Sequence, residues 1–157
     1  MTKKMTIWGI GWTLVLTGVP FAVVIGYLNS RFLPNLRLSF LPQAAAWIAG
    51  GILILCGVAM LFMSAGAVRK AFREGMLVTS GVFSLIRNPI YCAWIVLILP
   101  GIVLISRSVL LWLVPALMYV VFKMLIKKED GFLEERFGDE YRQYRAKTGE
   151  LFPRLRR

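Results

Sequence analysis

Long uninterrupted apolar blocks dominate the chain. Residues 5–30, 38–68 and 88–106 contain no charged side chain, and residues 108–126 contain one, Lys123. Each block can cross the roughly 30 Å hydrocarbon core of a bilayer, which takes about 20 helical residues. The pattern predicts an all-α, polytopic membrane protein whose four transmembrane helices lie at about 6–28, 44–66, 89–106 and 109–127, within a single membrane domain over residues 1–157.

The polar connections between these blocks differ in length. The turn between the last two spans is short (Ser106 to Ser108), so those spans form an antiparallel hairpin. Pro100 and Pro115 lie inside them, and a proline-induced kink either opens room for a ligand or has no functional role. The longer hydrophilic segments are the second loop, 67–88, and the C-terminal segment, 128–157. We expect any reaction to take place there, at the membrane interface.

Composition excludes several classes of protein. The chain is 58% hydrophobic and 17% charged, whereas soluble domains are about 45–50% apolar and about 25% charged. It contains no histidine, which removes the commonest metal ligand and the usual general base. Cys56 and Cys92 have no metal-like spacing. We therefore expect no metal site and no serine hydrolase triad.

The net charge of +11 is distributed unevenly among the connections. The N-terminus, the second loop and the tail hold 2, 4 and 10 Lys and Arg residues, 16 of the total of 19. The positive-inside rule then predicts an integral membrane protein with both termini cytoplasmic. The cations lie at the ends of apolar blocks rather than among exposed aromatics, so we expect the lipid bilayer, and no nucleic acid, as partner.

The acidic residues gather at one membrane boundary. Seven of the eight lie between Glu129 and Glu150, and none lies inside an apolar block. A small ion-coupled exporter would be expected to carry an intramembrane carboxylate, so this distribution disfavours a transporter. Glu129 and Asp130 stand side by side at the boundary, which is costly unless they are paired or bind a ligand.

Two segments allow both a structural and a functional interpretation. Residues 129–147 predict an amphipathic helix with Leu133, Phe137, Tyr141 and Tyr144 on one face, which either rests on lipid headgroups or covers a ligand site. In the second loop, a short β-prone run over 77–81 precedes Asn88 and Pro89, an N-cap and first helical residue that begin the third span.

These two segments also resemble a known family. LVTSGVFSLIRNPIY (77–91) resembles the motif L-V-x-x-G-x-Y-x-x-x-R-H-P-x-Y of the isoprenylcysteine carboxyl methyltransferase and phospholipid methyltransferase family. KKEDGFLEERFGDEYRQYRAKTGELFPR (127–154) is similar to the second half of that signature, E-E-x-x-L, then F-G-x-x-Y-x-x-Y and a terminal proline. The resemblance covers about 80 residues, including the hairpin between the motifs, and does not reach the first two spans.

The resemblance implies an S-adenosylmethionine-dependent membrane methyltransferase whose cofactor pocket is closed by the C-terminal helix (128–157). Arg87 and Glu129 are then the expected catalytic residues. The expected cofactor-binding residues are Leu77, Val78, Gly81, Arg87, Asn88, Pro89, Tyr91, Glu129 and Asp130. Two of these depart from the family pattern. Asn88 replaces a histidine and cannot titrate, and Asp130 replaces a glutamate and reaches one methylene less far.

Several functions remain open at this stage. Within the family, the acceptor is a lipidic or amphiphilic molecule. An isoprenylcysteine-like carboxylate or a thiol suits a chain without histidine, because neither needs a strong base. The alternative is a phospholipid amine, which needs a proton acceptor such as Glu129 or Tyr141. A reductase with a similar C-terminal signature would need more spans. Outside the family, a non-enzymatic four-helix scaffold would use its basic tail to bind anionic lipid.

Overall fold

Four helical spans make up the described part of the protein, as predicted. The computed structural model describes residues 10–154, so the predicted start of the first span (6–9), Lys3, Lys4 and residues 155–157 lie outside the described residues. The first two spans are α1 (Gly11–Phe32) and α2 (Gln43–Glu74). The third consists of α3 (Pro89–Cys92), a π-helical turn η2 (Ala93–Ile98) and α4 (Leu99–Ser106). The fourth consists of η3 (Leu110–Trp112) and α5 (Leu113–Lys147). All four are long and apolar enough to cross a membrane.

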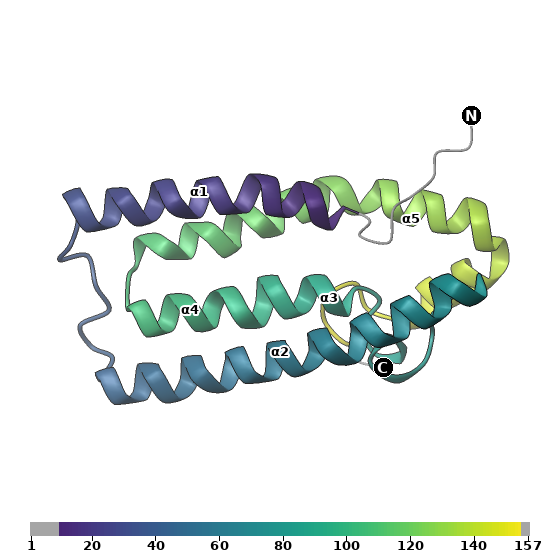
Figure 1. Ribbon diagram of the computed structural model, residues 1–157, viewed down its shortest axis with the longest axis horizontal. Helices are drawn as coiled ribbons and strands as arrows, with labels where there is room; N and C mark the ends of the chain where they lie inside the picture. Colours follow the sequence, from purple (N-terminus) through teal and green to yellow (C-terminus); the bar gives the residue numbers. More distant parts are fainter. Residues whose placement is uncertain (1–9, 155–157) are drawn as a thin grey trace.

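The spans pair off around the α4–α5 hairpin. α1 packs along α5 and α2 packs along α4 (Figure 1). Glycines allow α2 and α4 to approach closely, because a Cβ at Gly50 would lie 2.6 Å from the Gly101 carbonyl oxygen. In the described part of the chain, no comparable packing joins α1 to α2.

The end of the bundle at the hairpin turn is fastened by polar contacts. Arg107 has a left-handed backbone (φ 56°) and donates from Nη2 to the Leu38 carbonyl at 2.9 Å. The Leu38 amide donates back to the Arg107 carbonyl at 2.7 Å. The Ser108 hydroxyl donates to Asn29 Oδ1 at 2.7 Å. Structural contacts therefore join the hairpin turn to the first loop and to the end of α1.

The two prolines of the last spans have different local effects. Pro100 follows the π-helical turn. A proline in a helix removes one hydrogen bond and its ring clashes with the carbonyl four residues earlier. The wider π-helical turn relieves this clash. Pro115 is the third residue of α5, where its missing N–H falls in the first turn. The backbone angles of α5 around Pro115 are helical, so the helix is unbroken there, and the kink expected at Pro115 stays a prediction.

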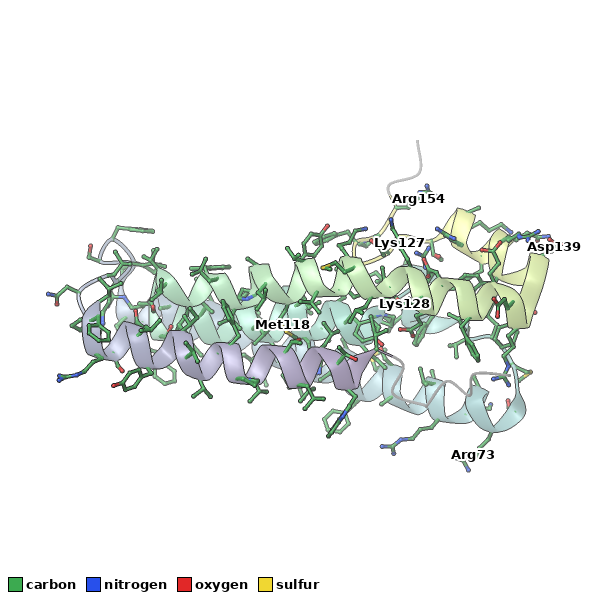
Figure 2. The ribbon with its side chains drawn as sticks, turned by 90° about the horizontal axis from the view of Figure 1, so that it is seen from above. Arg73, Met118, Lys127, Lys128, Asp139 and Arg154 are labelled. Atoms are coloured by element: carbon green, nitrogen blue, oxygen red, sulfur yellow. The ribbon has the colours of Figure 1, made fainter. Side chains whose placement is uncertain are left out.

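α5 is much longer than a membrane span requires, and it breaks near its end. Its 35 residues exceed the about 20 that cross the hydrocarbon, so the part beyond Lys127 and Lys128 extends past the apolar span. Gly138 has φ 55° and ψ −128°, a conformation that favours glycine. The chain turns back there, and Asp139 lies at the tip of the reversal (Figure 2). The uninterrupted helix predicted over 129–147 is wrong at this residue.

Candidate active site

A cavity of about 950 Å³ lies where the second loop, the returning end of α5 and the starts of α1 and α3 meet. Its size is near the upper end of the range for small-molecule sites, about 300–1,000 Å³. Its polar end contains Arg87, Asn88, Tyr91 and Glu129. Its apolar wall continues between the spans and includes Trp12, Val15, Val19, Ala22, Leu61, Ala65, Val68, Trp94, Leu99, Val114 and Met118.

The structure brings most of the predicted site residues to this cavity. The residues that line it are Leu77, Val78, Arg87, Asn88, Pro89, Tyr91 and Glu129. Gly81 and Asp130 do not line it. Gly81 (φ 63°) starts the short 3-10 helix η1 (Gly81–Ser84), which carries Phe83 into the cavity wall.

Asp130 turns away from the cavity and holds Arg87 instead. Arg87 Nη2 lies 3.2 Å from Asp130 Oδ2, and the two side chains are only 8% and 7% exposed. The Tyr141 hydroxyl donates to the other Asp130 oxygen. Arg87 Nε is buried and has no partner among the described residues. A donor desolvated in this way is costly unless a ligand accepts from it.

Glu129 faces the cavity from the adjacent position on α5. The Tyr91 hydroxyl donates to Glu129 Oε2 at 3.0 Å. Burial raises the pKa of Glu129, an effect opposed by the hydrogen bonds from Tyr91 and from the Ile10 backbone amide. Two successive acids therefore have different roles, since one binds an arginine and the other is available to a ligand.

The C-terminal segment closes the second loop by backbone pairing. The Arg87 amide donates to the Gly149 carbonyl at 2.7 Å, and the Asn88 amide donates to the Glu150 carbonyl at 3.2 Å. Asn88 Nδ2 donates to the same Glu150 carbonyl at 3.3 Å. Pro89 is at the first helical position, as predicted, but the Asn88 side chain does not cap the helix. The β-prone run at 77–81 forms no strand.

The aromatic face of the C-terminal helix covers the cavity rather than lipid. Tyr141 and Tyr144 are 0% and 8% exposed, and the Tyr144 hydroxyl donates to the Phe83 carbonyl at 2.7 Å. Both line the cavity together with Leu133 and Phe137. The interpretation in which this face rests on headgroups is therefore wrong for Tyr141 and Tyr144, while Leu133 and Phe137 are half-buried.

Several residues of the cavity wall were not predicted from the sequence. Met76, Phe132 and Arg136 line the cavity near the loop, and neither motif contains a signal for them. The contributions of α1 and α2 were also missed, because no signature covers those spans.

In the described residues, no three His, Cys, Asp or Glu side chains are arranged to hold a metal ion.

Comparison with known proteins gives two curated relatives and one family. The chain is 30% identical over 84 residues to a protein-S-isoprenylcysteine O-methyltransferase from Schizosaccharomyces pombe, covering 54% of this chain and 36% of the relative. It is 36% identical over 84 residues to the cobalt-zinc-cadmium resistance protein CzcN from Cupriavidus metallidurans, covering 53% and 38%. The matches thus span less than two-fifths of each relative. No solved structure matches. Residues 43–140, well over half of the chain, match the phospholipid methyltransferase family, and the chain belongs to that family.

Proposed function

We propose that this protein transfers a methyl group from S-adenosylmethionine to an amphiphilic acceptor at the membrane boundary. The single observation that carries the proposal is the composition of the cavity, which joins a polar end at Arg87, Asn88 and Glu129 to an apolar wall inside the bundle. A soluble substrate would not need that wall. A purely structural bundle would not need a buried arginine nitrogen without a partner.

The polar end suits the cofactor's functional groups. S-adenosylmethionine supplies an activated methyl group on a sulfonium, together with an ammonium, a carboxylate, ribose hydroxyls and an adenine. Arg87 would bind the carboxylate through its guanidinium, which Asp130 and Tyr141 keep in place. Glu129 would accept from the ammonium or a ribose hydroxyl. The Asn88 amide is already bound to Glu150, so it orients the loop.

The gap between α1 and α2 offers the acceptor a route from the bilayer. Both helices line the cavity, through Val19 and Ala22 on one side and Leu61 and Ala65 on the other. Among the described residues they share no packing comparable to that of α1 with α5 or of α2 with α4, so an apolar chain would pass between them without leaving the hydrocarbon. The basic residues at this end favour the cytoplasmic face as its location.

The protein's contribution to catalysis is alignment and exclusion of water. Holding two reactants in line is worth about 7–11 kcal/mol in favourable cases. Phe83, Tyr141 and Tyr144 close the loop side of the cavity and keep water from the reacting atoms. An isoprenylcysteine-like carboxylate has no proton to lose, and a thiol can lose its proton to water before transfer and react as the thiolate. Neither needs a strong base, and we therefore favour them over a phospholipid amine, for which Glu129 would have to take the proton.

Methyl transfer itself tests the proposal. The purified protein, reconstituted in liposomes with methyl-labelled S-adenosylmethionine, should transfer label to an S-farnesylcysteine carboxylate as a base-labile ester. Glu129→Ala should lose transfer, and Glu135→Ala, an exposed neighbour outside the cavity, should keep it. Base-stable label in phosphatidylethanolamine would identify the amine as acceptor. No label in either acceptor would contradict the proposal.

A further inference from the structure

A shallow groove of about 600 Å³ lies on the outer face of α5, apart from the cavity of the candidate active site. It is lined by Tyr119, Val120, Lys123, Met124 and Lys127, none of which lines that cavity. Tyr119, Lys123 and Lys127 follow one another at intervals of four residues, so they form one row along the helix. Val120 and Met124 form a second row beside them and are 52% and 70% exposed. The groove therefore faces the surrounding lipid.

Lys123 places a charge within an apolar span. It is the one charged residue in the sequence from 108 to 126, and its side chain is 46% exposed. A charge that faces hydrocarbon is costly unless it is paired or reaches the headgroups. Lys123 Nζ lies 2.5 Å from Glu150 Oε2, and the Glu150 carbonyl accepts from the Asn88 amide. The C-terminal segment thus brings a second charge to the lipid-facing side of α5.

The ion pair leaves hydrogen-bonding capacity at the groove. An ammonium has three donors, and Glu150 accepts from one of those of Lys123. Lys127 lies about 6 Å further along the helix axis, at the end of the apolar span, and lines the same groove. Figure 2 shows Lys127 and Arg154 on the same side of α5. Because Glu150 balances Lys123, Lys127 gives the groove a net positive charge at the membrane boundary.

We propose that this groove binds one anionic glycerophospholipid of the surrounding leaflet, with its phosphate between Lys123 and Lys127 and an acyl chain along Val120 and Met124. The cations lie toward the boundary and the apolar side chains toward the bilayer centre, which is the order of headgroup and chain in a phospholipid. The net positive charge favours an anionic over a zwitterionic headgroup. Because the groove and the cavity share no residue, this lipid is distinct from the methyl acceptor, and the inference is independent of the proposed function.

Native mass spectrometry of the detergent-purified protein measures the affinity for the first lipid bound. The wild type should bind phosphatidylglycerol about 5-fold more tightly than phosphatidylcholine, the factor expected of one lysine near an anionic headgroup. Lys127→Gln should abolish that preference. The matched control is Lys128→Gln, because Lys128 is also exposed, carries the same charge and does not line the groove. This control should keep the preference.

Photo-crosslinking locates the bound lipid. Phosphatidylglycerol with a diazirine in one acyl chain should label Val120 or Met124 in the wild type, and Lys127→Gln should lose that label. Glycerophosphoglycerol, which has the same headgroup and no chains, should not compete with it. Equal affinities of the wild type for the two lipids, or an equal loss of preference in Lys127→Gln and Lys128→Gln, would overturn the proposal. Label confined to the cavity wall, or competition by the headgroup alone, would overturn it as well.

Discussion

Removing the Asp130 carboxylate should destabilise the fold more than any other single acid-to-alanine change. Asp130 is 5% exposed and accepts hydrogen bonds from Arg87 and Tyr141. Asp130→Ala leaves the Arg87 guanidinium buried without a counter-charge. Breaking a buried pair in this way costs about 3–5 kcal/mol. For a chain of this size, about 2–4 °C per kcal/mol converts that loss to a fall in Tm of roughly 6–20 °C.

Thermal unfolding in detergent, followed by loss of the monodisperse chromatographic peak, measures this fall. Asp139→Ala is the matched control, because Asp139 is 84% exposed although it also pairs with an arginine, and its Tm should match the wild type. A decrease for Asp130→Ala no larger than for Asp139→Ala would refute the buried network. Replacing the whole network with Arg87→Met, Asp130→Leu and Tyr141→Phe should recover most of the Tm and still abolish cofactor binding.

The other predictions concern the cavity wall and the helix break. Ala22→Phe fills the apolar wall and should raise the KM for a farnesylated acceptor at least 10-fold while S-adenosylmethionine binding is kept. Val23→Phe, which places the same ring next to it but outside the cavity, should leave both unchanged, and equal effects of the two variants would contradict the route between α1 and α2. Gly138→Ala should cost about 1–3 kcal/mol of stability because of its left-handed backbone, whereas Gly131→Ala, in regular helix with open space around it, should gain about 0.5–1 kcal/mol. Thermal unfolding decides both, and a stable Gly138→Ala variant would show that the break needs no glycine.

The spans and most of the site could be predicted because each depends on local sequence. An apolar block without charges has few alternatives to a transmembrane helix, and Arg87, Tyr91 and Glu129 lie within the two motifs. Asp130 could not be assigned in the same way. Successive helical residues point about 100° apart, so of two adjacent acids one faces the cavity and the other faces Arg87, and only the packing of α5 decides which.

The break at Gly138 shows why the remainder was not predictable. Leu133, Phe137, Tyr141 and Tyr144 fit a helical period, and a single glycine in such a pattern is compatible with a continuous helix. The reversal depends on long-range contacts, since Tyr144 bonds the Phe83 carbonyl and Gly149 pairs with the second loop.

Calorimetric binding of S-adenosylmethionine and S-adenosylhomocysteine to the detergent-purified protein tests the central claim most directly. We predict binding in the micromolar range to the wild type, lost in Glu129→Ala and Arg87→Ala and kept in Glu135→Ala, which is exposed on the same helix and does not line the cavity. Absence of binding to the wild type, or equal binding to all four proteins, would contradict the assignment of this cavity to the cofactor.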